Sequence, residues 1–389
     1  MKEQGIDRWQ WHGILFVLSV LLTLCVGCSS DEEPVEPKLN IYVYAPERAE
    51  VTRSEIVPTQ EEGLIHNLQI WVYRSSDPSK LVASLTITSE SELQGLNEHK
   101  SASYSIALAD NSFAEKPEPV DIYVMANVLD NNGTNYLETV NTSEDLETAV
   151  FNGGHFFNFL KAPAYQAVTT VPSDKGVPMS GVARGRSVID KNNVLHINDA
   201  NLKLVRTVSK IRFVLSSLEG LSPVIIDRIT LDNKMMYQKV RFFLDDDHPD
   251  YWVEGPPFDQ EVLLVKGDRV NPIVQNEDPT VYSYSSSMSD DDYETLVNEG
   301  VSDGKLTEEG PVYLPESDKR LSGTIYFRLG SGGSLMSAPF SMAAGNFRRN
   351  QTWIVYAYYI GSSKLEVNTV QVIDWEKEDN LPDHEIPNW

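Results

Sequence analysis

Alternation of apolar and polar residues with a period of two is the feature that most limits what this chain can fold into. Successive side chains of a β-strand point to opposite faces, so such alternation in β-branched and aromatic residues is typical of half-buried strands. The sequence therefore predicts a mainly antiparallel β fold, most simply one or more β-sandwiches. The clearest predicted strands are residues 39–44, 68–73, 81–87, 120–128, 208–215, 224–231, 324–329, 352–360 and 367–375.

Helical patterns are few, and the length of the chain suggests more than one domain. Thr142–Asp145 and Ser289–Asp292 have the spacing of a capping box, so a short helix is expected after each. At about 100–200 residues per domain, 389 residues suggest two domains. Gly176–Lys191 is rich in turn-forming residues, and we place the boundary there. The expected division is a signal peptide (1–27), an acidic tether (28–38), an N-terminal β-sandwich domain (39–185) and a C-terminal one (186–389).

The N-terminus reads as a lipoprotein export signal. Gly13–Val26 is an apolar run too short to span a membrane and of the right length for a signal peptide. It ends at Cys25-Val26-Gly27-Cys28, which resembles a lipobox and makes Cys28 the expected site of lipidation. The segment Ser29–Glu33 that follows ends in three acidic residues and resembles the acidic tag that directs lipoproteins to the outer face of the outer membrane. An uncleaved anchor and a signal peptide cut elsewhere are the alternatives.

Charge and cysteine content exclude several classes of function. The chain carries 32 Lys and Arg against 57 Asp and Glu, a net charge of −25, which repels nucleic acid. Both cysteines, Cys25 and Cys28, lie near the N-terminus, so no disulfide can form within the mature fold. The fold is expected to form without a cofactor.

Motifs that carry chemistry are scarce. Gly300–Gly304 fits G-x-S-x-G, but a nucleophile elbow needs a strand before the serine and a helix after it, and a polar helix is expected before Ser302. The seven histidines form no close ligand pair, so no metal site is predicted. Asp245–Asp247 and Asp290–Asp292 are read as solvated acidic loops, with a weak cation site as the alternative. We predict no catalytic residues.

A series of short motifs, taken in order, resembles the fimbrillin family of Bacteroidetes, the subunits of surface fimbriae. Each motif is weak alone, and their order along the chain carries the resemblance. They are Thr52-Arg53, residues 64–73, residues 120–128 ending in Ala126-Asn127, Val177–Gly181, Leu204–Ile211, Tyr313–Glu316, Arg349-Asn350 and residues 370–375.

The resemblance implies two tandem transthyretin-like β-sandwiches and assembly by strand exchange. A protease would cut after Arg53, or after Arg48 as second choice, and remove the strand that carries Leu39, Ile41 and Val43. The vacated slot would accept a donor strand from the next subunit. The residues of the candidate donor strand are Leu365, Val367, Val370 and Val372.

On this reading the chain is a non-enzymatic adhesive subunit. Its partners would be other fimbrial subunits, the outer membrane through a lipid anchor, and ligands on host or bacterial surfaces. Whether it is a stalk, an anchor or a tip subunit stays open, as does the alternative that residues 367–375 are the last strand of their own domain. A second class of function is a glycan-binding surface lipoprotein, suggested by 17 Tyr and 7 Trp that could form aromatic platforms. A hydrolase that uses Ser302 is the third.

Overall fold

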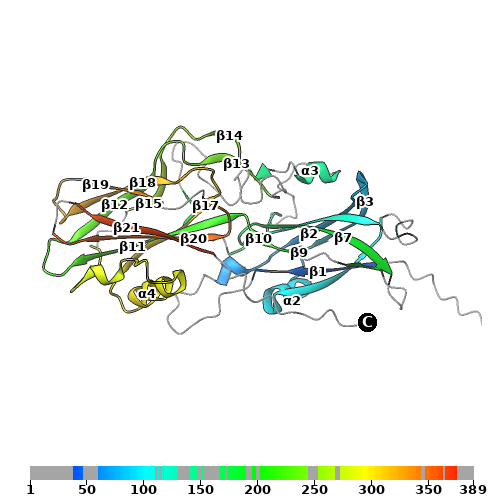
Figure 1. The fold of residues 1–389 in the computed structure, drawn as a ribbon, viewed down its shortest axis with the longest axis horizontal. Helices are drawn as coiled ribbons and strands as arrows, with labels where there is room; N and C mark the ends of the chain where they lie inside the picture. Colours follow the sequence, from blue (N-terminus) through cyan, green and yellow to red (C-terminus); the bar gives the residue numbers. More distant parts are fainter. Residues whose placement is uncertain are drawn as a thin grey trace, which may run out of the picture. The chain divides into compact units, whose positions relative to one another are not determined.

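The fold is mainly β, as the sequence predicts, and most strand pairs are antiparallel (Figure 1). The described residues lie in one compact unit that spans Lys38–Trp389. Within them, we find no helix with the length and apolarity needed to cross a bilayer. The computed structural model describes residues 38–46, 60–109, 113, 116, 118–129, 141–147, 150–151, 167–171, 173–189, 195–198, 202–243, 253–267, 272–342, 347–361 and 364–374.

The first half of the chain forms one nine-stranded sheet with its main path in the order β3-β2-β5-β7-β8-β1-β4. The two ends of that path meet at a bridge between Ala83 and Leu108, so the sheet wraps around its own core. The short strands β9 and β10 pair with β1 and β7. The strands are β1 (Lys38–Tyr44), β2 (Leu68–Arg74), β3 (Asp77–Ile87), β4 (Ser101–Ala107), β5 (Pro119–Ala126), β7 (Met179–Ile189), β8 (Leu195–Asn198), β9 (Leu202–Lys203) and β10 (Val205–Arg206).

A helix that we did not predict, α2 (Glu90–His99), packs beside β4. Its signals are weak: Leu93 and Leu96 are its buried apolar residues, and Ser89 stands at the N-cap without a capping hydrogen bond. A Cβ added at Gly95 would lie 3.2 Å from the Cβ of Ala102, so this glycine permits close contact between α2 and β4. A short 3-10 helix, η1 (Gln60–Gly63), precedes β2.

The second half forms a sandwich of two sheets covered by a helix on one side. In the first sheet, β11 lies between β17 and β20, and β21 lies at the edge; the second has the order β15-β12-β18-β19. The strands of the first sheet are β11 (Val208–Leu218), β16 (Gln275–Asn276), β17 (Thr307–Pro315), β20 (Gln351–Tyr359) and β21 (Glu366–Asp374). Those of the second are β12 (Val224–Leu231), β15 (Val262–Lys266), β18 (Ser322–Leu329) and β19 (Met336–Ser341).

Three further strands form a separate small sheet, and three further helical segments complete the fold. The small sheet has the order β14-β13-β6. These elements are β6 (Val150–Phe151), β13 (Tyr237–Arg241), β14 (Val253–Pro257), α3 (Ser143–Glu147), the 3-10 helix η4 (Pro279–Tyr282) and α4 (Asp290–Ser302).

Strand β11 is buried on both faces. Phe213 of β11 meets Phe340 of β19 edge to face, with ring centroids 5.6 Å apart, in the core between the two sheets. On the other face, Val214 of β11 joins Tyr293 and Val297 of α4 in a second apolar cluster. Figure 1 shows α4 on the side of this sheet that faces away from β12 and β18. Polar residues on the outer face of β11 are therefore buried as well.

The predicted strands are confirmed, with two corrections. The segment that we read as turn-rich is largely strand β7, and that reading was wrong. A Cβ at Gly181 would lie 2.2 Å from the carbonyl oxygen of Lys203, so this glycine serves a close approach between backbones. The sheets are also mixed, because β1 runs parallel to β8 and β9 and β11 runs parallel to β16 and β20.

The division into two domains stays a prediction. The nine-stranded sheet continues past residue 185 to Arg206, and the next sheet begins at Val208. If the domains follow the sheets, we propose that the boundary lies at Thr207. Both predicted helix starts are confirmed: Thr142 Oγ1 accepts from Asp145 N at 3.1 Å, and Ser289 Oγ accepts from Asp292 N at 3.2 Å. The first helix is short, and β6 follows it.

Candidate functional site

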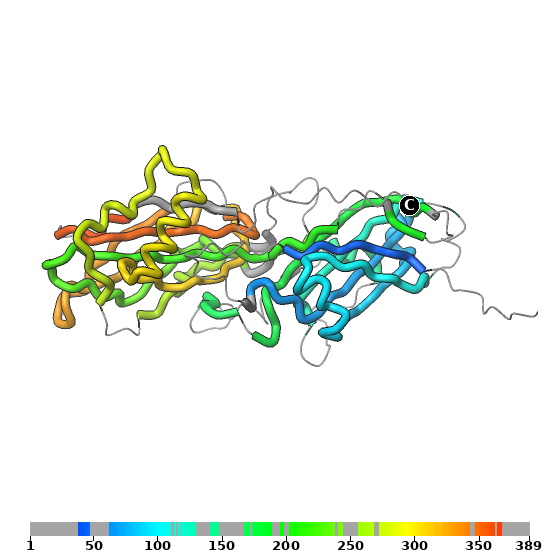
Figure 2. Tube along the Cα trace, turned by 90° about the horizontal axis from the view of Figure 1, so that it is seen from below, coloured from blue at the N-terminus to red at the C-terminus, as the bar shows by residue number. Residues whose placement is uncertain are grey.

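The N-terminal strand β1 is held inside the first sheet rather than at an edge. On one side it pairs antiparallel with β4 along its whole length, from Lys38 opposite Ala107 to Tyr44 opposite Ser101. On the other side it runs parallel to two short strands, β8 near its start and β9 near its end. In Figure 2, β1 is the dark blue tube beside green segments from much later in the chain. Loss of β1 would therefore expose backbone hydrogen-bonding groups on three neighbouring strands, β4 on one side and β8 and β9 on the other.

One face of β1 is part of the hydrophobic core. Leu39, Ile41 and Val43 are each at most 2% exposed, whereas Tyr42 on the opposite face is 45% exposed. This is the alternation that the sequence predicts for these three residues. Full burial of such a side chain is worth about 1.5–3 kcal/mol, so the three together hold β1 in place by several kcal/mol.

Other candidate residues of the N-terminal region lie outside the described residues. These are Cys28, the proposed lipidation site, and Arg48 and Arg53, the proposed cleavage sites. The described structure ends at Pro46 after β1 and resumes at Gln60 with η1. Their roles stay predictions.

The candidate donor segment forms strand β21, paired antiparallel with β20 of the same chain. Leu365 is buried and Val367 packs partly buried against the core. The backbones of Val370 and Val372 lie opposite Val355 and Trp353. This arrangement matches the reading in which these residues are the last strand of their own sheet.

An irregularity divides β21 into two pieces. Its register with β20 shifts between Val355 and Tyr356, which lie opposite Val370 and Asn368. Thr369 is thus the extra residue of a β-bulge. The bulge explains why the apolar positions Leu365 and Val367 are out of phase with Val370 and Val372.

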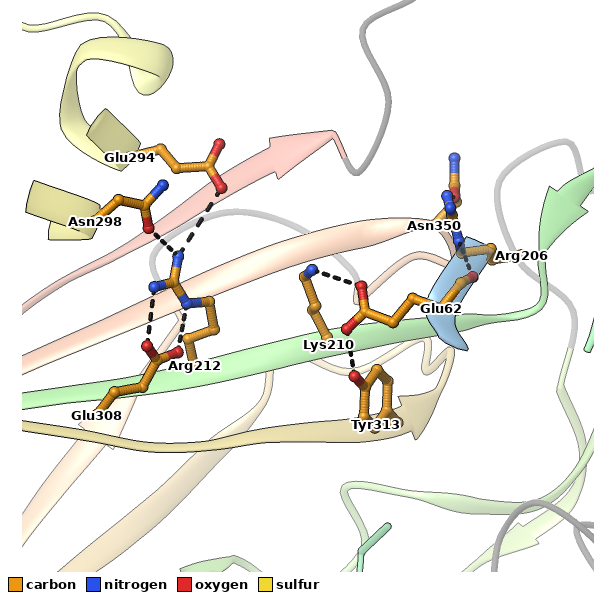
Figure 3. A network of polar contacts seen from close by, with 9 residues as sticks. All are labelled: Glu62, Arg206, Lys210, Arg212, Glu294, Asn298, Glu308, Tyr313 and Asn350. Carbon is orange, nitrogen blue, oxygen red and sulfur yellow. Dashed lines mark hydrogen bonds and ion pairs between the residues drawn. The ribbon is translucent and has the colours of Figure 1, made fainter. Parts of the chain in front are cut away.

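A buried network of charges ties η1 to β10, β11 and β17 (Figure 3). Glu62 is 1% exposed. Its carboxylate accepts a hydrogen bond from Tyr313 and lies 3.1 Å from the ammonium of Lys210, and its carbonyl oxygen accepts from Arg206 Nε at 3.3 Å. Burial lowers the pKa of Lys210, and the Glu62 carboxylate opposes part of this shift. Arg206 and Lys210, two residues of the motif Leu204–Ile211, thus both contact Glu62.

A second network on the same face of β11 attaches α4. Arg212 binds the Glu308 carboxylate with Nε and NH2, at 2.6 and 3.1 Å. Its NH1 donates to Asn298 Oδ1 at 2.9 Å and lies 3.9 Å from Glu294, both on α4 (Figure 3). The guanidinium therefore links β11, β17 and the helix that covers them.

Two asparagines from separate motifs fix the backbone that leads into β2. Asn127 has a positive φ of 61°, which asparagine tolerates. Its Nδ2 donates to the carbonyl oxygens of Leu64 and Val177, each at 2.8 Å. Asn67 Oδ1 in turn accepts from the backbone N–H of Val128 at 3.0 Å. Residues from three of the motifs that resemble the fimbrillin family, at 64–73, 120–128 and 177–181, thus contact one another here.

The motifs near residues 316 and 349 form a buried ion pair. Arg349 Nε donates to Glu316 Oε2 at 2.9 Å, and its NH2 donates to the other carboxylate oxygen. The remaining N–H groups reach the carbonyl oxygens of Phe242 and Arg241, both at 2.6 Å. Ser180 also donates to the Phe242 carbonyl, at 2.5 Å. The polarity of these motifs therefore has a structural explanation.

The catalytic and metal candidates find little support among the described residues. Ser302 is the exposed last residue of α4, so a helix precedes it instead of the strand that a nucleophile elbow requires. Asp290–Asp292 form the first turn of α4, where carboxylates interact favourably with the helix dipole. No group of three or more possible metal ligands occurs in the described residues. Asp245–Asp247 lie outside them.

We expect the folded protein to be insensitive to chelators and reductants. Thermal unfolding of the chain from residue 29 onward should give the same melting temperature with and without EDTA or a thiol reductant, because its stability rests on packing and buried ion pairs. A clear fall in melting temperature with EDTA would instead show that an acidic cluster holds a cation.

Buried tyrosines make the protein sensitive to alkali. Burial, with the Glu92 charge, raises the pKa of Tyr104 to about 12, and burial also raises the pKa of Tyr123, Tyr293 and Tyr356. An unfolded chain loses these protons near pH 10, before the folded chain does, so the free energy of unfolding should fall as the pH rises above about 10. Urea titrations at several pH values measure this slope. Tyr104→Phe should reduce it, and an unchanged slope would contradict the assignment.

Solved structures of cell adhesion proteins and of a fimbrial assembly protein are similar to this chain. A candidate cell adhesion protein from Parabacteroides distasonis superposes with a TM-score of 0.51 at 16% identity, over 89% of this chain and 99% of that one. One from Bacteroides eggerthii gives a TM-score of 0.49 at 14% identity, over 87% and 96%. A fimbrial assembly protein from Parabacteroides distasonis gives 0.45 at 11%, over 86% and 98%. No protein-family model and no curated protein matches the sequence.

The similarity defines a class of fold. At 16% identity, the Parabacteroides distasonis structure shows a shared architecture over nearly the whole of both chains. At the level of fold, this similarity agrees with the resemblance that the ordered motifs suggest.

Proposed function

We propose that this protein is a surface-exposed, lipid-anchored subunit of a fimbria, which assembles by strand exchange after proteolysis and serves adhesion. The observation that carries the proposal is the position of β1. It is an internal strand with three buried apolar side chains, and residues 47–59, which contain both candidate arginines, connect it to the rest of the fold. A cut within this connection leaves β1 held by noncovalent contacts alone.

The slot that β1 occupies defines the strand that could replace it. A replacement that runs in the direction of β1 keeps the antiparallel pairing with β4 and the parallel pairing with β8 and β9. It must also place apolar side chains at every second position, as Leu39, Ile41 and Val43 do. Edges left unpaired on both sides favour the addition of a strand from another chain.

The candidate donor meets these demands in part. If β21 were straightened and extended by one residue to Leu365, Leu365, Val367 and Thr369 would lie on one face with the required spacing. To act as donor, the segment must first leave β20, where it pairs as an edge strand. Release of an edge strand breaks hydrogen bonds on one side only, which is less costly than release from the middle of a sheet.

Lipidation at Cys28 provides the membrane attachment of the uncut chain in this proposal, because a cut after Arg53 separates Cys28 from the rest of the subunit. We expect a fatty-acid analogue fed to cells to label the wild-type protein and not Cys28→Ala, since Cys28 follows the short apolar run and a lipobox-like sequence. Several acyl chains anchor stably, whereas a single one is marginal. Cys25→Ala is the matched control and should be labelled like the wild type. Equal labelling of Cys28→Ala would contradict the assignment.

A glycan-binding surface lipoprotein is the alternative function. Binding platforms for sugars use exposed aromatic rings. Among the described residues, Tyr42 is the one aromatic side chain in the set of large apolar residues that are strongly exposed. Polysaccharide pull-down of the purified protein tests this alternative, and polymer formation after trypsin treatment tests the fimbrial function. Retention on polysaccharide without polymers would favour the glycan-binding function.

A further inference from the structure

The segment that follows the proposed cleavage site is bound along its length by polar side chains. We call residues 62–67 the clamp segment. Glu62 is bound by Lys210, Tyr313 and Arg206, as described above. The backbone of Ile65 donates to Asn97 Oδ1 at 2.8 Å and accepts from Asn97 Nδ2 at 3.0 Å.

The next residues of the clamp segment are bound by Asn127. The carbonyl oxygen of Leu64 accepts from its Nδ2, and the backbone N–H of His66 donates to its Oδ1, both at 2.8 Å. The carbonyl oxygen of Asn67 accepts from the backbone N–H of Asn127 at 3.1 Å. The clamp segment is irregular and has no strand partner, so side chains satisfy its backbone hydrogen-bonding groups instead. These bonds make the segment rigid.

The partners of the clamp segment come from elements other than β1. Those described are Asn97 of α2, Asn127 after β5, Arg206 and Lys210 of β10 and β11, and Tyr313 of β17. Strand β1 pairs instead with β4, β8 and β9. Removal of β1 therefore breaks one set of bonds and leaves the other intact.

We propose that the clamp segment stays fixed when β1 leaves, and that Glu62 is the positioning residue that keeps the new N-terminal end out of the open slot. Glu62 is the clamp residue nearest the cut and the one held by charges. A new N-terminal end that frayed past Glu62 could reach the vacated slot and refill it with its own apolar residues. Fixed at Glu62, it leaves the slot open for a second chain.

The test uses a cut that does not depend on the natural protease. A site-specific protease sequence is inserted after Arg53, the full chain is cut, and the released N-terminal peptide is removed by gel filtration in mild urea. Hydrogen exchange is then compared between cut and uncut protein. The inference relies on the proposed function only for the place of the cut, and polymer formation plays no part in the readout.

We expect β4 to exchange at least about tenfold faster after the cut, while the amides of Ile65 and His66 keep their uncut rates. In cut Glu62→Gln protein, the clamp segment should exchange about tenfold faster or more, because a charge-assisted contact is lost. Uncut Glu62→Gln should show a smaller increase, since the chain still joins the clamp segment covalently to β1. Loss of clamp protection in the cut wild type, to the same degree as in β4, would overturn the proposal.

Glu308→Gln is the matched control. Glu308 is a mostly buried carboxylate, with its side chain 11% exposed against 2% for Glu62, and it binds Arg212 rather than the clamp segment. This variant should lower overall stability without a selective increase of exchange in residues 62–67 after the cut. If Glu62→Gln and Glu308→Gln give the same exchange pattern, Glu62 has no positioning role.

Discussion

Trypsin treatment should convert the purified wild-type protein from a monomer into a ladder of polymers, and Arg53→Ala should remain monomeric. Arg53 lies in a connection rich in charged residues between β1 and η1. A cut there frees β1. Its loss uncovers the part of the core in which Leu39, Ile41 and Val43 were buried. Refilling of this slot by another chain recovers several kcal/mol of apolar burial, plus backbone hydrogen bonds on both sides. The change in polymer yield should therefore be nearly complete.

Two further chains control this experiment. Arg48→Ala removes the other candidate arginine and should still polymerise. A chain truncated before Leu365 lacks the candidate donor strand and should be cut without polymer formation, provided that circular dichroism shows it folded. Equal ladders from Arg53→Ala would show that another site is cut. If no variant forms ladders, the subunit does not assemble by this route.

Replacement of Arg349 by methionine should destabilise the protein by about 3–5 kcal/mol, the largest effect we expect from a single substitution. The change removes four hydrogen bonds and leaves the Glu316 carboxylate, which is 0% exposed, without its cation. A buried carboxylate without its cation costs far more than the ion pair itself contributes. Urea unfolding of wild type and variant measures the difference.

A double substitution and an exposed pair supply the controls. Arg349→Met combined with Glu316→Leu removes both charges and should recover much of the loss, because no carboxylate then stays buried. Arg228→Met breaks an ion pair with Asp227 whose side chains are 37% and 30% exposed, and it should cost about 0–1 kcal/mol. A similar small cost for Arg349→Met would contradict the account of the buried pair.

Several strands with large side chains on one face were predicted, whereas two strands built partly from small residues, β4 and β7, were not. The alternation in β1 and β12 is unmistakable, and both lie where the sequence places them. Strand β4 alternates too, but Tyr104 and Ile106 are its only large apolar residues among serines and alanines. In β7, Gly181 is needed for close backbone contact, but in the sequence it resembles a turn signal.

The motifs could be found from the sequence, but their physical role could not. Asn127 acts on Leu64 and Val177, and Arg349 acts on Glu316, which are contacts between residues far apart in sequence. Period and composition carry no information about such pairs. Glu62 was missed because one more glutamate in an acidic chain gives no signal. Arg206 and Lys210, the partners of Glu62, did give a signal, because these charged residues lie in or next to an apolar strand that must bury them.

Electron microscopy of native cells labelled with gold-conjugated antibody against this protein tests the central claim most directly. We expect label on fibres that extend from the cell surface, and the position of the label along the fibre would distinguish a stalk subunit from an anchor or a tip. Cells that carry Cys28→Ala should lose surface-attached label. Label spread over the outer membrane, with no association to any fibre, would contradict a fimbrial subunit and favour a glycan-binding surface protein.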